Sequence, residues 1–251
     1  MTISVENAVS GLGANNNVSQ LIIGTNTGTA YSNSGTNRVV VLHIGLTVAG
    51  TTPASVSSIT SPNLTWTKRN SVNCIQAADT TSVETWWAFA SAQVSSEHIT
   101  VNFNNLPKCV AMHIFSVVGC NTPSSPWDSD ASLPGSGANT TTSNTTPQNL
   151  SPISFGDTDP LLIYVQATRN PSFTQTPPTG FTQIGPTNQE PGAGSDRCYM
   201  VSGYKANGSP ASSQTYSGTP SEQLWVMDVD VLAGGATPPP RPPTSSAVVL
   251  S

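Results

Sequence analysis

Charged side chains are scarce in this sequence. They make up 8% of the 251 residues, whereas globular proteins average about 25%. The eight lysines and arginines are spread along the chain, and thirteen acidic residues bring the formal net charge to −5. A nucleic-acid-binding protein needs clustered basic residues to neutralise phosphates. The composition therefore argues against a nucleic-acid partner.

Long apolar stretches are also missing. The longest, from Val39 to Leu46, has eight residues and contains His43, whereas a membrane span needs about 20. The first residues, Met1 to Asn7, have neither the basic nor the apolar segment of a secretory signal peptide. We therefore expect no membrane partner and no export by a signal peptide.

Cysteine is limited to four positions, without a CxxC pair or a histidine at ligand spacing, so neither a zinc site nor another metal site is expected. These positions are Cys74, Cys109, Cys120 and Cys198. Cys109 and Cys120 bracket a predicted strand about 30 Å long, which excludes their pairing if the strand is straight. Other pairings stay open, but four reduced and mostly buried thiols suit a chain without an export signal.

Neutral polar residues are abundant instead, with 34 Ser and 32 Thr. Helical periodicity is nearly absent, and short runs of period-two alternation are separated by Gly, Pro, Asn and Ser. This pattern predicts an all-β protein, an antiparallel β-sandwich. The predicted strands are Val39 to Val48, Val83 to Phe89, Ile99 to Phe103, Val110 to Val118, Leu161 to Ala167, Arg197 to Lys205 and Leu224 to Leu232.

The two halves of the chain repeat the same order of segments. Residues 39–48, 64–67, 83–89, 100–101 and 110–118 correspond to 161–167, 180–182, 197–205, 215–216 and 224–232. This correspondence aligns Trp87 with Tyr204 and Met112 with Met227. We interpret the halves as two related β modules that pack as the two sheets of one sandwich of about eight to ten strands, with jelly-roll connectivity.

Residues 1–35 are expected to form an N-terminal arm with the first strands, and residues 36–232 the sandwich domain. A Ser/Thr-rich loop at 121–151 is either a passive crossover or an interaction loop. Residues 233–251 form a predicted extended tail, because proline cannot join a sheet interior. Its apolar end either adds a strand to a neighbouring subunit or is a frayed terminus. The candidate assembly residues of this tail are Pro238, Pro239, Pro240, Val248, Val249 and Leu250.

Three pairs of acids are spaced two residues apart: Asp128 and Asp130, Asp157 and Asp159, and Asp228 and Asp230. Two facing carboxylates are needed for glycoside hydrolysis, but this spacing alone does not establish them. Acids that lie in loops or on an outer face explain the pairs better. In the last strand, Asp228 and Asp230 alternate with apolar residues, so we expect one dry face and one face in water. Calcium at Asp157 and Asp159 is a weaker alternative, because further oxygen ligands are lacking.

The histidines His43, His98 and His113 lie in or next to predicted strands, without a Gly-x-Ser-x-Gly elbow. We interpret them as structural, although His43 and His113 would meet if their two strands pair. Phosphate-loop and dinucleotide motifs are missing as well, so the sequence predicts neither a cofactor nor an enzyme.

Adjacent aromatic residues supply the candidate contact site. Trp86 and Trp87 must point to opposite faces of one strand, so at least one lies outside the sandwich core. There it meets a loop, a partner or a glycan. We therefore select Trp86, Trp87 and Trp127 as candidate partner or glycan contacts.

A succession of short motifs carries a resemblance to a known family. They are Leu64-Thr65-Trp66-Thr67, Glu84-Thr85-Trp86-Trp87-Ala88, Ile99-Thr100-Val101, Phe115-Ser116-Val117-Val118-Gly119 and Ser125-Pro126-Trp127-Asp128. Over residues 36–232 the chain resembles a β-sandwich domain of structural proteins of tailed bacteriophages and of prophage-derived bacterial proteins. The resemblance implies a virion component, such as a capsid decoration or tail protein, and brings no catalytic residues.

Two functions follow as expectations. The first is a non-enzymatic virion protein that is assembled in the host cytoplasm, most simply a capsid decoration protein. Its partners are other virion proteins or further copies of the chain. The second is a carbohydrate- or receptor-binding module that uses Trp86 or Trp87 together with the 121–151 loop.

Overall fold

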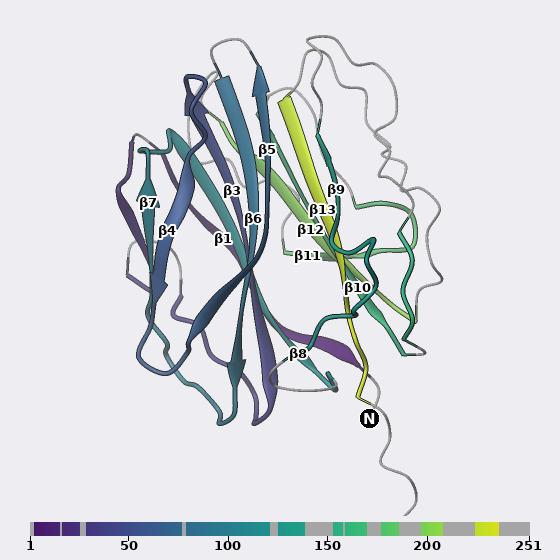
Figure 1. The fold of residues 1–251 in the computed structure, drawn as a ribbon. Helices are drawn as coiled ribbons and strands as arrows, with labels where there is room; N and C mark the ends of the chain where they lie inside the picture. Colours follow the sequence, from purple (N-terminus) through teal and green to yellow (C-terminus); the bar gives the residue numbers. More distant parts are fainter. Residues whose placement is uncertain are drawn as a thin grey trace, which may run out of the picture.

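The protein is all-β, as the alternation predicted. The computed structural model describes residues 3–15, 17–25, 29–76, 79–120, 125–138, 153–157, 159–169, 177–185, 197–207 and 224–235. Within these residues the chain forms thirteen strands, paired antiparallel in three sheets, and no helix (Figure 1).

Two five-stranded sheets make up the sandwich. The central sheet has the order β1-β8-β3-β6-β5 and contains β1 (Ser4–Asn15), β3 (Arg38–Ala49), β5 (Trp66–Gln76), β6 (Asp79–Ala90) and β8 (Cys109–Val118). The second sheet has the order β11-β12-β10-β13-β9 and contains β9 (Gly135–Ala138), β10 (Leu161–Arg169), β11 (Thr182–Ile184), β12 (Tyr199–Ala206) and β13 (Leu224–Leu232).

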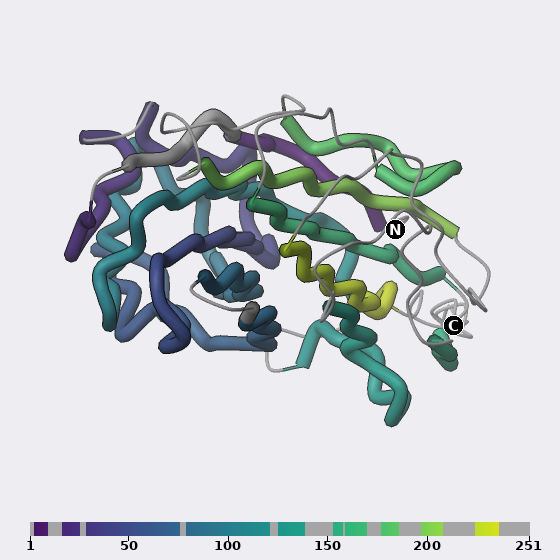
Figure 2. The backbone as a smooth tube through the Cα atoms, turned by 90° about the horizontal axis from the view of Figure 1, so that it is seen from above, coloured from purple at the N-terminus to yellow at the C-terminus, as the bar shows by residue number. Residues whose placement is uncertain are grey.

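A three-stranded sheet adds a third layer, which the sequence did not predict. It has the order β2-β7-β4 and contains β2 (Gln20–Ile23), β4 (Ser55–Thr60) and β7 (Ile99–Asn104). In β3, Val40 and Leu42 pack toward this sheet, whereas Val39 and Val41 pack toward the second sheet. Strand β3 is buried on both faces, which explains why its sequence is a nearly continuous apolar run. In Figure 2 the green and yellow strands of the second sheet lie to one side of the blue strands.

All seven predicted strands exist, but one lies in an unexpected layer. Strand β7, predicted as part of the sandwich, is the middle strand of the three-stranded sheet. Its residues Ile99, Val101 and Phe103 alternate inward and belong to the same apolar cluster as Trp86 of β6. The central sheet therefore has two apolar faces, and each face is covered.

Strand order supports the predicted repeat for the four segment pairs that the structure describes in the two five-stranded sheets. The order β1-β8-β3-β6-β5 in the central sheet matches β9-β13-β10-β12-β11 in the second sheet, strand for strand along the chain. Each five-stranded sheet is thus one module of the repeat. This strand order does not confirm the finer expectation of jelly-roll connectivity.

Strand register gives the same result. The middle rows of the two sheets are His113-His43-Thr85 and Asp228-Val165-Ser202, each given in the order of its strands. The alignment of Trp87 with Tyr204 makes Thr85 equivalent to Ser202, and the alignment of Met112 with Met227 makes His113 equivalent to Asp228. The two pairs of residues aligned in the sequence therefore fall on the same pair of rows.

The sheets approach each other closely at Gly45 of β3. A Cβ at this position would lie 3.0 Å from Ala167 Cβ and 3.1 Å from Cys198 Sγ. Overpacking of a dense core costs about 1–3 kcal/mol, and we expect Gly45→Ala to lower the free energy of unfolding by that amount in urea denaturation. The control is Gly156→Ala, where the new methyl group would meet nothing within 4 Å. Equal stability of the two variants would contradict the close approach.

Candidate functional site

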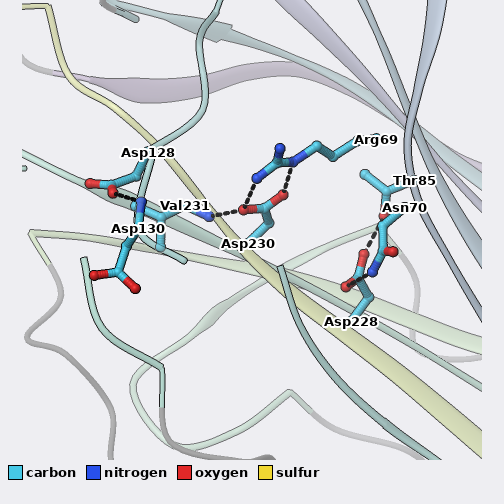
Figure 3. Close-up of polar contacts among 8 residues, drawn as sticks. All are labelled: Arg69, Asn70, Thr85, Asp128, Asp130, Asp228, Asp230 and Val231. Atoms are coloured by element: carbon cyan, nitrogen blue, oxygen red, sulfur yellow. Dashed lines mark hydrogen bonds and ion pairs between the residues drawn. The ribbon is translucent and has the colours of Figure 1, made fainter. Parts of the chain in front are cut away.

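Two acidic side chains of β13 lie between the central and second sheets (Figure 3). The exposed fractions of Asp228 and Asp230 are 2% and 1%. The expectation that this face of β13 meets water is therefore wrong, because the acids face β5 and β6. The apolar residues of the opposite face, Trp225, Met227 and Val229, pack in a separate cluster. Both faces of β13 are thus buried.

Arg69 of β5 neutralises Asp230. Its Nε donates to Asp230 Oδ2 at 2.6 Å, and its Nη2 donates to Oδ1 at 3.2 Å. The Val231 backbone N–H donates to Oδ1 at 2.9 Å. Burial raises the pKa of Asp230, and the hydrogen bonds and charge of Arg69 oppose that rise. A buried carboxylate is tolerated when it is paired in this bidentate way.

Asp228 has neutral partners. Asn70 Nδ2 donates to Asp228 Oδ1, and Thr85 Oγ1 donates to Oδ2, both at 2.8 Å. Burial, followed by the neighbouring charge of Asp230, raises the pKa of Asp228 to about 7. A carboxyl that titrates near neutral pH suits general acid–base chemistry. Here, however, it is buried and bonded to its own chain, so its role in this arrangement is to join the sheets.

Two of the three candidate tryptophans meet at the edge of this cluster. Trp127 has an exposed fraction of 7%, and its ring lies edge-on to that of Trp87, with centroids 6.3 Å apart. The Arg69 guanidinium lies 5.0 Å from the Trp127 ring centroid. Trp127 comes from the segment after the central sheet and forms a β-bridge with Leu232. The inward face of Trp87 therefore contacts a loop. A loop was one of the three contacts, with a partner and a glycan, that the sequence left open.

Trp86 points to the opposite face, as adjacent strand residues must, and lies in the core under the three-stranded sheet. Its Nε1 donates to Glu84 Oε2 at 2.7 Å. Lys68 Nζ lies 2.9 Å from the same oxygen and 5.1 Å from the Trp86 ring centroid. Glu84 Oε1 accepts the Val56 backbone N–H at 3.0 Å. The carboxylate of Glu84 thus anchors the three-stranded sheet to the central one.

The two strand histidines do meet, as the sequence predicted for paired strands. His43 and His113 are direct partners across β3 and β8. Each ring places Nδ1 3.0 Å from Ser202 Oγ of the second sheet. The hydroxyl donates to one ring and accepts from the other, so the two histidines take opposite tautomers. Burial lowers the pKa of His43 to about 3 and that of His113 to about 4.

Removal of the shared hydroxyl tests this contact. Ser202→Ala leaves two buried ring nitrogens without their partner, and we expect a loss of about 1–3 kcal/mol in the free energy of unfolding. Ser58→Ala is the control, because Ser58 Oγ is exposed and bonded to Asn102, and a change within about 0.5 kcal/mol is expected there. Urea denaturation of both variants measures the difference, and an unchanged stability of Ser202→Ala would contradict the bridging role.

The sheet-to-sheet contacts come in equivalent pairs. Thr85 of β6 bonds Asp228 of β13, and His113 of β8 bonds Ser202 of β12. In the repeat, Thr85 corresponds to Ser202 and His113 to Asp228, so each contact is the counterpart of the other. Reciprocal contacts of this kind characterise a two-fold interface. In these two contacts the modules are therefore related as the subunits of a two-fold dimer are.

The remaining acid pairs lie in loops, one of the two locations that the sequence predicted, and their side chains organise those loops. Asp128 Oδ2 accepts the backbone N–H groups of Gly156 and Asp157, both at 3.0 Å. Its Oδ1 accepts the backbone N–H of Asp130 at 2.9 Å, as Figure 3 shows. Asp157 Oδ1 accepts the N–H of Asp159 at 2.8 Å. His98 lies apart from these loops, at the surface, with Nδ1 3.0 Å from Thr25 Oγ1.

Sequence reasoning missed Arg69, Asn70 and Glu84. One signal was present, since Lys68 and Arg69 are the only adjacent basic residues in a chain with few charges. They point to opposite faces of β5. Lys68 pairs with the buried Glu84 on the side of the three-stranded sheet, and Arg69 pairs with the buried Asp230 on the side of the second sheet. A short basic pair in an otherwise neutral strand can thus indicate buried carboxylates elsewhere.

Some candidates lie outside the described residues. These are the assembly residues Pro238, Pro239, Pro240, Val248, Val249 and Leu250, the segment 215–216 and most of the 121–151 loop. Among the residues that the structure describes, no three His, Cys, Asp or Glu side chains are arranged to hold a metal ion. In the same part of the chain, no helix has the length and apolarity to cross a membrane.

Comparisons with known proteins do not assign a function, so any function must be argued from the structure. No protein-family model, no curated protein and no solved structure matches this chain.

Proposed function

We propose that this chain is a non-enzymatic structural protein of a bacteriophage virion, with capsid decoration as its role. The observation that carries the proposal is that the buried acids and histidines, the side chains most suited to chemistry, form hydrogen bonds within the protein itself. Asp228, Asp230, His43 and His113 all bond across the sandwich. These groups support a rigid scaffold, which leaves surface and chain ends for function. The motif resemblance to phage structural proteins supplies the virion setting.

The two ends of the described chain support an assembly role. Ser4 of β1 pairs with Val118, and the Gly235 backbone N–H donates to Gly119 O at 2.7 Å. Both ends therefore lie beside the last residues of β8, at the end of the molecule marked N in Figure 1. A single neighbouring virion subunit, or a second copy, can contact both ends there.

Quantitative mass spectrometry of purified phage particles tests the proposal. The chain is expected in the particle at a copy number comparable with that of the major capsid protein. A few copies per particle would indicate a tail or fibre position instead. Its absence from particles would overturn the virion role.

Truncation after Gly235 tests the role of the tail. It keeps the β-bridge of Gly234 with Cys120 and the hydrogen bond to Gly119. We expect the truncated chain to unfold at the same urea concentration as the full chain but to bind particles more weakly, measured by co-sedimentation. Equal binding by both chains would show that residues 236–251 are not used in assembly.

The alternative, carbohydrate binding, is favoured by one observation, which involves neither Trp86 nor Trp87. On the outer face of the three-stranded sheet, Gln20 Nε2 donates to Asn102 Oδ1 at 2.9 Å, and Asn102 Nδ2 donates to Ser58 Oγ at 3.0 Å. This exposed row of neutral donors and acceptors matches the hydrogen-bonding groups of a sugar. A glycan panel tests it, with Asn102→Ala as the variant expected to lose any signal. Background binding by the full chain would remove this alternative.

A further inference from the structure

Strands β8 and β12 face each other across the sandwich and run in the same direction. His113 and Ser202 fix their relative position with a 3.0 Å contact. Cys109 and Cys198 each lie four residues earlier along the chain, and the Cys198 backbone N–H donates to Cys109 Sγ at 3.1 Å. The two cysteines are therefore the next inter-sheet contact along the same pair of strands.

Small residues bring the sheets together at this point. Facing sheets are usually about 10 Å apart, which leaves room for side chains from both. Here Gly45, Ala111 and Ala167 surround the cysteines, so a sulfur of one sheet touches the backbone of the other. Disulfide formation needs Cα atoms no more than about 7 Å apart, a condition that facing strands rarely meet.

The two sulfur atoms converge on the same part of β3. Cys198 Sγ lies 3.1 Å from the position of a Cβ on Gly45. Cys109 pairs with Thr47, two residues further along β3 on the same face. Both thiols are fully buried in one apolar cluster. The geometry thus places both sulfurs in one small space between the modules.

We propose that Cys109 and Cys198 are an oxidisable pair that forms a disulfide across the sandwich and covalently joins its two modules. The oxidant is a low-molecular-weight disulfide, such as oxidised glutathione. One cysteine thiolate attacks it, forms a mixed disulfide and releases one glutathione thiolate. The second cysteine thiolate then displaces the other glutathione. Two cysteine thiols are oxidised, one glutathione disulfide is reduced to two thiols, and the two cysteine protons end on the released thiolates.

The other two cysteines are separated from this pair. Cys120 lies beyond the opposite end of β8, where it bridges Gly234. Cys74 shares the apolar cluster but comes from the edge strand β5. Burial raises the pKa of the Cys198 thiol well above its ordinary value, so exchange waits for a transient opening of the sheets. Formation is therefore expected to be slow in the folded protein and faster during refolding.

The experiment exposes the full-length chain to oxidised glutathione in two arms. One arm uses the folded protein, and the other refolds it from urea in a mixture of reduced and oxidised glutathione. We expect an intact mass lower by two hydrogen atoms, protection of two of the four thiols from alkylation, and one peptide pair that links Cys109 to Cys198. The linked form should unfold at a higher urea concentration than the reduced form, and dithiothreitol should abolish the shift.

Variants assign the link to these two residues. Cys120→Ala should keep the link and Cys198→Ala should lose it. The peptide map of the unmodified chain identifies the linked residues directly, even if a variant fails to fold. Alkylation of all four thiols after both arms would overturn the proposal. So would a glutathione adduct that persists, or a link that uses Cys74 or Cys120.

One consequence rests on the proposed virion role, whereas the link itself does not. A particle assembled in a reducing cytoplasm would acquire the link after it reaches an oxidising medium. Mass spectrometry of particles before and after release separates the two ideas. Absence of the chain from particles refutes the virion role, and an unlinked chain in released particles refutes only this consequence.

Discussion

Replacement of Arg69 by alanine is expected to lower the free energy of unfolding by about 3–5 kcal/mol, the usual cost of leaving one member of a buried ion pair behind. Arg69 donates two hydrogen bonds to Asp230, whose exposed fraction is 1%. The variant leaves that carboxylate between two sheets without its charged partner. The Trp127 ring loses the guanidinium at 5.0 Å as well. Urea unfolding followed by tryptophan fluorescence measures the loss.

Two further measurements separate this mechanism from general damage to the core. Asp230→Asn in the Arg69→Ala background removes the unpaired charge and should recover much of the stability. The matched control is Arg169→Ala, which breaks an ion pair with the more exposed Asp79, where about 1 kcal/mol or less is expected. Equal losses for Arg69→Ala and Arg169→Ala would contradict the buried-pair argument.

Asp228→Asn is expected to stabilise the protein by about 4 kcal/mol above neutral pH, since each unit of pKa shift corresponds to about 1.4 kcal/mol. Burial raises the pKa of this carboxyl from 3.8 to about 7. The ionised form therefore costs stability, and asparagine resembles the neutral form. Its amide can still accept from Asn70 and can donate to Thr85 in place of the hydrogen bonds that the carboxylate accepts.

The sign of the pH dependence follows from proton uptake. Between pH 7 and 3.8 the native state holds a proton on Asp228 that the unfolded chain lacks, so the contribution of this carboxyl to wild-type stability rises as the pH falls. The raised pKa of Asp230 acts in the same direction. The advantage of Asp228→Asn is therefore full above about pH 7 and shrinks toward about pH 4.

The buried histidines work in the opposite direction. The pKa values of His43 and His113 fall from 6.5 to about 3 and about 4. Below pH 6.5 the unfolded chain binds two protons that the native state excludes, a loss of up to about 2.7 kcal/mol per pH unit. Buried acids offset part of this loss in the wild type. Unfolding free energy measured across this range should therefore fall more steeply in Asp228→Asn.

A charge-matched control completes that experiment. Asp157→Asn removes the same charge from a loop acid whose Oδ1 accepts the Asp159 N–H. Its pH profile is expected to parallel that of the wild type. A profile of Asp228→Asn that also parallels the wild type would show that Asp228 does not hold a proton near neutral pH.

Much of the fold was predictable because alternation and turns are local signals. The alternation over 224–232 predicted a strand, and β13 spans Leu224–Leu232. The alignment of Trp87 with Tyr204 and of Met112 with Met227 falls on corresponding rows of the two sheets, as expected for a repeat that preserves register. The meeting of His43 with His113 followed once their strands were paired.

The candidate site was predictable only in part. Alternation places Asp228 and Asp230 on one face of a strand, but it carries no information about what covers that face. For Trp86 the unforeseen cover is a third sheet, and for Asp230 it is Arg69, 161 residues away in sequence. Partners so distant leave no periodic trace along the chain.

The sequence by itself determined the all-β class, the positions of seven strands and the repeat of two modules, because each depends on the order and spacing of neighbouring residues. Only the tertiary structure decided that the acids of β13 are buried, that Ser202 joins two histidines and that Cys109 meets Cys198. The physical reason is that sheets pack through side chains from opposite modules. Which faces meet is set by three-dimensional packing and not by any local pattern.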